Sequence, residues 1–262
     1  PNSMNRIFDS HAHYDDAAFD SDREMVLTTL LPQNGICGLI DCGASLESSR
    51  KALFLAQKYS YIYAAIGLHP EEVKEAPENW LTELEQMLKK KDSKLIAIGE
   101  IGLDYHFAEN ASREEQKKAF IAQLELAKRY DLPVIIHDRE AHGDTMEILR
   151  KYRPRGVMHC FSGSVEMMRE LVKFGMYVGL GGAVTFKNAR VPVAVAAAVP
   201  SDRLLTETDC PYMAPVPFRG KRCDSTMIPK SAAVIAQARN CTTEEVLQLG
   251  IENACRLFHI AL

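Results

Sequence analysis

A short apolar strand that ends in two histidines opens the chain, in the segment RIFDSHAH at residues 6–13. Side chains of a β-strand alternate between its two faces, so His11 and His13 are expected to point the same way. Both follow the apolar residues, where the strand gives way to a loop. Two imidazoles in such a place indicate half of a metal site, and the rest of the chain would have to supply the other half.

Seven further β-rich runs alternate with helical patterns along the rest of the chain. Several are continuously apolar, as expected for parallel strands that are covered on both faces. Helix starts are visible between them, because Ser112 with Glu115 fits a capping box and Thr242 with Glu245 fits another. The predicted strands are 6–10, 38–42, 61–66, 95–101, 133–137, 156–160, 176–179 and 203–206.

Eight strands that alternate with helices in a chain of 262 residues predict a single (β/α)8 TIM-type barrel with parallel strands. Helix-rich sequence after residue 228 predicts a helical C-terminal end. No linker or repeat divides the chain, so residues 4–262 are expected to form one domain. Pro1-Asn2-Ser3 resembles the remnant of an expression tag and is left out of the fold prediction.

The composition excludes some classes of function. A net charge of −4 argues against a broad surface that coats nucleic acid, although a local basic loop could still bind a few phosphates. Seven cysteines without a C-x-x-C pair indicate free thiols in a reducing compartment, so a cytoplasmic location is expected. No apolar run is long enough to span a membrane and no secretory leader is seen, so no membrane partner is expected.

Histidines and carboxylates recur where the predicted strands end. In a parallel barrel these ends converge on one face, where catalytic groups gather. Each residue alone could be an ordinary loop or capping residue, but their placement at six strand ends makes coincidence the weaker explanation. Glu207, two residues before Asp209, is expected to lie deeper and to support a ligand. The converging residues are His11, His13, His69, Glu100, His137, His159 and Asp209.

An ordered set of short motifs resembles the TatD-related DNase family of metal-dependent hydrolases, part of the amidohydrolase-like barrel superfamily. The resemblance runs from about residue 6 to residue 258 and implies a barrel with a metal-dependent deoxyribonuclease activity of the exonuclease type. The motifs are DSHAH at 9–13, GLHP at 67–70, GEIGLDY at 99–105, HDREA at 137–141, HCFSG at 159–163, GGAVTFKNA at 181–189, ETDCPY at 207–212 and NACRLF at 253–258.

Spacing and resemblance together imply a site for two divalent metal ions. His11, His13 and Asp209 would hold one ion and His137 and His159 the other, while the two oxygens of Glu100 would bridge them. A water between the ions would lose a proton readily and become the nucleophile, and Asp209 could accept that proton. Four histidines favour zinc or manganese, and two carboxylates leave room for magnesium.

Substrate contacts are expected from one histidine and several basic residues. His69 would act in catalysis and, with Arg139, touch phosphate. Arg219, Lys221 and Arg222 would guide a nucleic-acid strand. Members of the family often carry RGKRNEP after the last ligand, whereas this chain has RGKRCDS at 219–225. The basic part is retained, and the polar contacts that follow it differ.

Three functions remain open from the sequence. The leading one is a deoxyribonuclease that acts on the ends of single-stranded DNA, without an obligate protein partner. The second is hydrolysis of another ester or amide bond, such as an aminoacyl ester, because the same nucleophile can attack a carbonyl carbon. The third is a non-catalytic metal-dependent binding protein, which the complete ligand set argues against.

Overall fold

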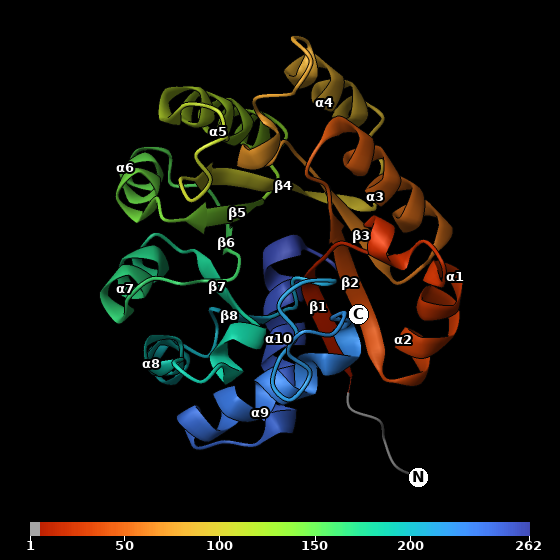
Figure 1. The fold of residues 1–262 in the computed structure, drawn as a ribbon, viewed down its shortest axis with the longest axis vertical. Coiled ribbons are helices and arrows are strands. Elements are labelled where there is room, and N and C mark those ends of the chain that lie inside the picture. The colour runs from red at the N-terminus through yellow and green to blue at the C-terminus, as the bar shows by residue number, and fades with distance from the viewer. Residues whose placement is uncertain (1–5) are drawn as a thin grey trace.

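The computed structural model describes residues 6–262, and the proposed tag residues 1–3 lie outside this range. Eight parallel strands pair in chain order from β1 to β8 and form a nearly closed barrel (Figure 1). The predicted TIM-type (β/α)8 barrel is confirmed. The strands are β1 Ile7–Ala12, β2 Ile36–Cys42, β3 Ile62–Ile66, β4 Leu95–Asp104, β5 Val134–Arg139, β6 Gly156–Met158, β7 Tyr177–Leu180 and β8 Leu204–Thr206.

Helices follow the strands and cover the outside of the barrel (Figure 1). Short 3-10 turns and one π-helical turn, Val26–Leu30, complete the connections. The long helix α5 begins as predicted, because Ser112 accepts a hydrogen bond from the amide of Glu115. The α-helices are α1 Arg23–Met25, α2 Leu31–Gln33, α3 Leu46–Lys58, α4 Trp80–Lys89, α5 Arg113–Arg129, α6 His142–Tyr152, α7 Val165–Lys173, α8 Arg190–Ala198, α9 Ile228–Arg239 and α10 Thr243–Phe258.

Side chains join the first strand to the last. The hydroxyl of Ser10 donates to the carbonyl oxygen of Thr206 at 3.1 Å, and the hydroxyl of Thr206 donates to the carbonyl oxygen of Phe8 at 2.8 Å. Just beyond them, the amide of His13 donates to the carbonyl oxygen of Cys210 at 3.0 Å. These bonds hold the ends of β1 and β8 together, where several of the predicted site residues lie.

The last helix closes one end of the barrel. Ile251, Ala254 and Phe258 of α10 belong to one buried cluster with Phe8 and Ile135, which lie on strands. Packing of apolar α10 side chains against the barrel removes them from water, which stabilises the fold. The carboxyl ends of the strands lie at the opposite end, and this end remains available for a site.

Four strands end later than the sequence predicted, and one ends earlier. β1 extends to Ala12 and β4 extends to Asp104, so that both strands carry polar residues into the site. β6 ends at Met158 rather than at residue 160. Cys160 has a φ of 47°, a left-handed conformation that cannot continue a strand. No described helix, within residues 6–262, is long and apolar enough to cross a membrane.

Gly102→Ala is expected to destabilise the barrel strongly. Gly102 has a φ of +146°, and a Cβ at this position would lie 1.9 Å from the carbonyl oxygen of His137 on the neighbouring strand β5. Because both the backbone conformation and the strand pairing would have to change, we expect a loss of about 3 kcal/mol or more. Thermal unfolding followed by circular dichroism measures this as a lower melting temperature.

Gly143→Ala is the matched control for this substitution. Gly143 lies in the first turn of α6, and a Cβ there would meet nothing within 4 Å. Alanine is the better helix former, so the control should melt at the same temperature as the wild type or slightly higher. Equal melting temperatures for Gly102→Ala and the control would contradict the steric argument.

Candidate metal centre

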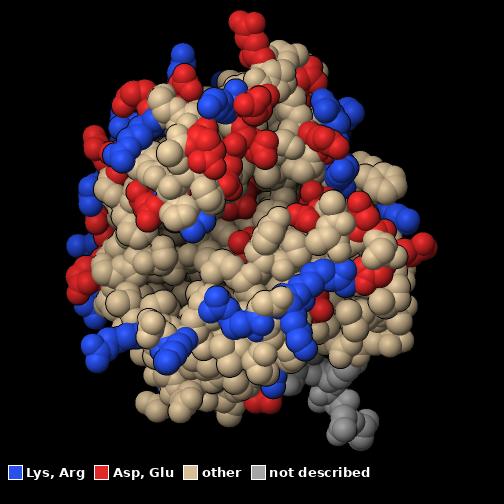
Figure 2. Space-filling view, in the orientation of Figure 1, with Lys and Arg blue, Asp and Glu red and all other residues tan. Residues whose placement is uncertain are grey.

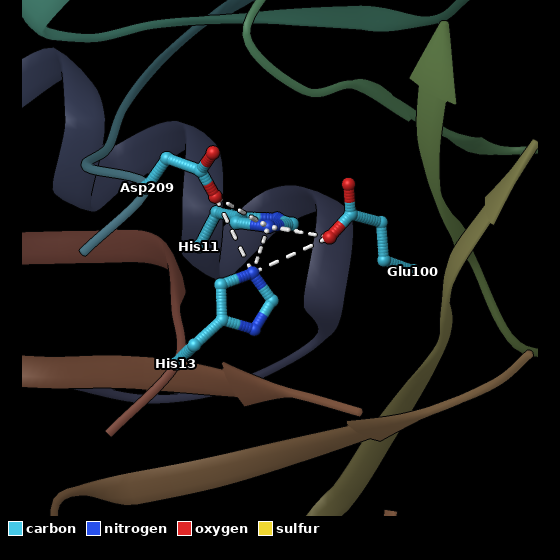
Figure 3. Close-up of side chains that lie close together, drawn as sticks. All are labelled: His11, His13, Glu100 and Asp209. Carbon is cyan, nitrogen blue, oxygen red and sulfur yellow. Dashed lines mark hydrogen bonds and ion pairs between the residues drawn. The ribbon is translucent and has the colours of Figure 1, made fainter. Parts of the chain in front are cut away.

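Two histidines and two carboxylates converge at the carboxyl ends of three strands (Figure 3). Oε1 of Glu100 lies 3.1 Å from Nε2 of His11 and 3.3 Å from Nε2 of His13. Oδ1 of Asp209 lies 3.5 Å and 3.3 Å from the same two nitrogens. The sequence predicted that His11, His13 and Asp209 share one ion, and the structure brings their ligand atoms together.

The second oxygen of Glu100 faces a different group of histidines. Oε2 lies 2.9 Å from Nδ1 of His137, 3.5 Å from Nε2 of His69 and 3.8 Å from Nε2 of His159. The Glu100 side chain is only 5% exposed, so these contacts replace most of its hydration. Its two oxygens are therefore divided between two sets of nitrogens, as a bridging carboxylate requires.

Three of the four predicted histidine ligands have their other nitrogen fixed from outside the centre. Nδ1 of His13 lies 2.9 Å from the carbonyl oxygen of Cys42. Nδ1 of His159 lies 3.0 Å from Oε2 of Glu207. Nε2 of His137 lies 2.9 Å from Oδ2 of Asp104. Such partners set the orientation and tautomer of metal-binding histidines, so this donor set fits divalent metal ions.

His69 is arranged as a hydrogen-bond donor. Its Nδ1 accepts a hydrogen bond from the backbone amide of Glu71 at 3.0 Å. The proton of the neutral ring therefore lies on Nε2, which points toward Glu100. A protonated nitrogen cannot bind a metal ion, but it can donate to an anionic oxygen. His69 thus suits a contact with phosphate better than a place among the ligands.

The histidines keep both central carboxylates ionised. Burial raises the pKa of Glu100, but electrostatic interactions with the rings of His11 and His69 and hydrogen bonds from His11 and His13 outweigh burial and hold this pKa well below its ordinary value. Burial likewise opposes the charge of Asp209, and His159 and His13 outweigh it and lower the pKa. Two carboxylates that are anionic at neutral pH can take up cations without first losing a proton.

The predicted phosphate-binding arginines differ in their surroundings. Arg139 ends β5 at the mouth of the centre, with its guanidinium 5.2 Å from the ring centroid of Phe107. Arg219 lies over the ring of Phe186 at 3.6 Å from its centroid. Among residues 6–262, no carboxylate lies within ion-pair distance of Arg139, Arg219 or Lys221, and all three line cavities at the centre.

Arg222 lies outside these cavities and is engaged elsewhere. Its two terminal nitrogens donate to the two oxygens of Asp22 at 2.8 Å and 2.7 Å, and one also donates to the carbonyl oxygen of Ala18. This two-point ion pair ties the loop after β8 to the segment after β1. The structure does not bring Arg222 together with the other predicted substrate contacts.

Asp104 is a site residue that was not among the predicted ligands or phosphate contacts. It is buried, and it fixes the outer nitrogen of His137 while its other oxygen accepts from the amide of His106. Its position four residues after Glu100 on the same strand was the available signal. Glu207 was predicted to lie deeper than Asp209 and to support a ligand; it is buried, contacts Nδ1 of His159 and accepts a hydrogen bond from the amide of Cys160 at 2.5 Å.

Comparisons with known proteins agree with this architecture. A family model described as TatD related DNase matches residues 8–259. The uncharacterized metal-dependent hydrolase YabD of Bacillus subtilis (strain 168) is 40% identical over 260 residues, which cover 97% of this chain and 99% of that protein. The 3'-5' ssDNA/RNA exonuclease TatD of Edwardsiella piscicida is 35% identical over 239 residues, which cover 87% of this chain and 90% of that protein.

A solved structure has the same fold over nearly the whole chain. The crystal structure of YjjV, a TatD homolog from Escherichia coli K12, superposes with a TM-score of 0.92 at 34% identity and covers 98% of this chain and 100% of that one. The barrel and its histidine and carboxylate centre define the class as a metal-dependent hydrolase. Within that class, the chain belongs to the TatD-related DNase family, so the resemblance seen in the motifs is confirmed.

Proposed function

We propose that this hydrolase is a two-metal exonuclease that cleaves phosphodiester bonds at the ends of single-stranded DNA or RNA. The observation that carries the proposal is the division of the Glu100 oxygens between two sets of histidine nitrogens at an open cavity. The names of two relatives, each called a 3'-5' ssDNA/RNA exonuclease, support a nucleic-acid strand as substrate and its 3′ end as the point of attack.

The proposed ligands follow from the same geometry. His11, His13 and Asp209 would hold one divalent ion, His137 and His159 would hold the other, and Glu100 would belong to both. Bound ions would activate water and neutralise charge on the phosphoryl group. Imidazole nitrogens suit zinc or manganese, while the carboxylates also accept magnesium, so we propose these three metals as cofactors.

The protein's own side chains would position the substrate and move a proton. Nε2–H of His69 would donate to a phosphate oxygen, and the guanidinium of Arg139 would pair with the same charge. Asp209 would accept a proton, because its side chain is 23% exposed and can pass the proton to solvent. Arg219 and Lys221 would bind the following phosphates of the strand.

We also propose a cellular compartment for this protein. All seven cysteines are free thiols, and three of them are buried. Free thiols are typical of proteins from a reducing environment, which supports the cytoplasm as the place of action. No protein partner is proposed.

An assay on metal-stripped protein tests the proposed function. Magnesium, manganese and zinc are added back separately to protein given 5′-labelled single-stranded DNA, double-stranded DNA, RNA and an aminoacyl ester. The expected result is metal-dependent shortening of single strands from the 3′ end, with double strands cut more slowly. Hydrolysis of the aminoacyl ester alone would favour the second candidate reaction, and hydrolysis of no substrate with any metal would favour a non-catalytic protein.

A further inference from the structure

Two cavities of similar size meet at the metal centre. One, of about 630 Å³, is lined by Asp15, Asp16, Glu71 and Glu72 in addition to the centre, and is called here the acidic pocket. The other, of about 640 Å³, is lined by Arg219 and Lys221 and is called the basic pocket. His137, Arg139 and Asp209 line both, so the proposed reaction takes place where the two pockets join.

The charges of the two pockets are not neutralised locally. Within residues 6–262, no lysine or arginine lies within ion-pair distance of Asp16, Glu71 or Glu72. Figure 2 shows acidic side chains gathered on one side of the central hollow and basic side chains on the other. A chain of phosphates is attracted to the basic side and repelled by the acidic side, because among the described residues no lysine or arginine pairs with these carboxylates and no carboxylate pairs with Arg219 or Lys221.

An apolar ridge separates the pockets. Tyr212 and Met213 line both cavities and are 55% and 38% exposed. Both side chains are therefore accessible to a ligand that enters either pocket.

The ring of Tyr212 is fixed at both ends. Its backbone amide donates to the carbonyl oxygen of Asp209 at 2.8 Å, and its hydroxyl donates to Oδ2 of Asp16 at 2.8 Å. The ring therefore stands at a set distance from the proposed ligand Asp209. Phe107 also lines the acidic pocket, so that pocket has two aromatic side chains among its carboxylates.

We propose that the terminal nucleoside of the strand stacks on Tyr212 in the acidic pocket, while the rest of the strand leaves through the basic pocket. An aromatic face suits any base, and a nucleoside that ends in a hydroxyl brings no charge into the acidic pocket. A strand that ends in a phosphate would bring a charge of about −1.5 to −2 against Glu71 and Glu72 and would bind more weakly. This inference rests on the proposed nuclease function and assigns its specificity to residues outside the metal centre.

Substitutions of Tyr212 test the stacking contact. Tyr212→Leu keeps apolar bulk but removes the ring, and it should raise KM for single-stranded oligonucleotides about tenfold with a smaller change in kcat. Tyr212→Phe keeps the ring and should raise KM less than Tyr212→Leu does. On a strand whose 3′-terminal residue lacks its base, the wild type and Tyr212→Leu should have the same KM. If Tyr212→Leu raised KM equally for the normal and the abasic strand, the stacking role would be overturned.

Terminal phosphates test the acidic pocket. Wild-type protein should degrade a 3′-hydroxyl strand about tenfold faster than the same strand with a 3′-phosphate at low salt, and the ratio should fall as salt rises. The double variant Glu71→Gln and Glu72→Gln should bring the ratio close to one. The control changes two exposed carboxylates of α5, Glu114→Gln and Glu125→Gln, and should keep the wild-type ratio.

The outcomes separate this inference from the proposed function. Equal rates on the two strand ends in the wild type, or an unchanged ratio in the Glu71 and Glu72 variant, would overturn the specificity while the nuclease function stands. Absence of nucleotide release from either strand with every metal would instead remove the nuclease function, and the specificity with it.

Discussion

Glu100→Gln is expected to lower the rate of strand-end hydrolysis about a thousandfold or more, because it removes the carboxylate whose two oxygens are divided between the two sets of histidines. Glutamine has the same size as glutamate, so the shape of the centre is kept. Its amide nitrogen would replace one oxygen and cannot accept a hydrogen bond or bind a cation. The one remaining side-chain oxygen could face only one of the two sets of histidine nitrogens, in the place of Oε1 or of Oε2.

Single-turnover hydrolysis of a labelled single strand, at saturating metal, measures this effect. Glu147→Gln serves as the control, since Glu147 is an exposed residue of α6 and undergoes the same chemical change. The control should hydrolyse at the wild-type rate, and circular dichroism should show both variants folded. A Glu100→Gln protein that retains wild-type activity would contradict the bridging role.

Asp209→Asn is expected to lower hydrolysis about a hundredfold to ten-thousandfold, the range for loss of a general base. Oδ1 of Asp209 lies 3.3 Å to 3.5 Å from nitrogens of His11, His13 and His159. Asparagine keeps the side-chain size and loses the negative charge. Because Asp209 is one of two carboxylates near these nitrogens, the variant should also bind its metal more weakly.

Metal concentration separates the two contributions of Asp209. If the variant fails only to bind metal, excess metal should restore the wild-type rate, whereas loss of a proton acceptor should leave kcat low at saturation. Asp202→Asn, at an exposed position just before β8, is the control and should behave as the wild type. Full activity of Asp209→Asn at ordinary metal concentrations would contradict both roles.

The strand pattern predicted the metal centre because a parallel barrel brings the carboxyl ends of its strands close together. Glu100 and His11 are 89 residues apart in the chain but 3.1 Å apart in space, as parallel strands of one barrel require. Residue types at the strand ends, together with the resemblance to the family, therefore predicted which side chains meet. The irregular pairing of β1 with β2 between Asp9 and Ala12 could not be predicted, since nothing in the residue types shows it.

The contacts that fix the outer nitrogens of the histidines could not be predicted from the sequence, for a different reason. The partner of His13 is the carbonyl oxygen of Cys42, and every residue has such an oxygen, so residue identity gives no signal. From the sequence, the three basic residues at 219–222 likewise appear equivalent. Only the fold shows that Asp22 pairs with Arg222 and leaves Arg219 and Lys221 to line the cavity.

Counting bound metal ions tests the central claim most directly. Metal-free wild-type protein and Glu100→Gln are titrated with manganese, and the ions bound per chain are measured beside the hydrolysis rate. The account predicts two ions per wild-type chain, with activity rising as the second binds, and weaker binding with fewer ions at the same concentration in Glu100→Gln. Full wild-type activity with a single ion, or two ions bound with unchanged affinity in Glu100→Gln, would contradict a two-metal centre bridged by Glu100.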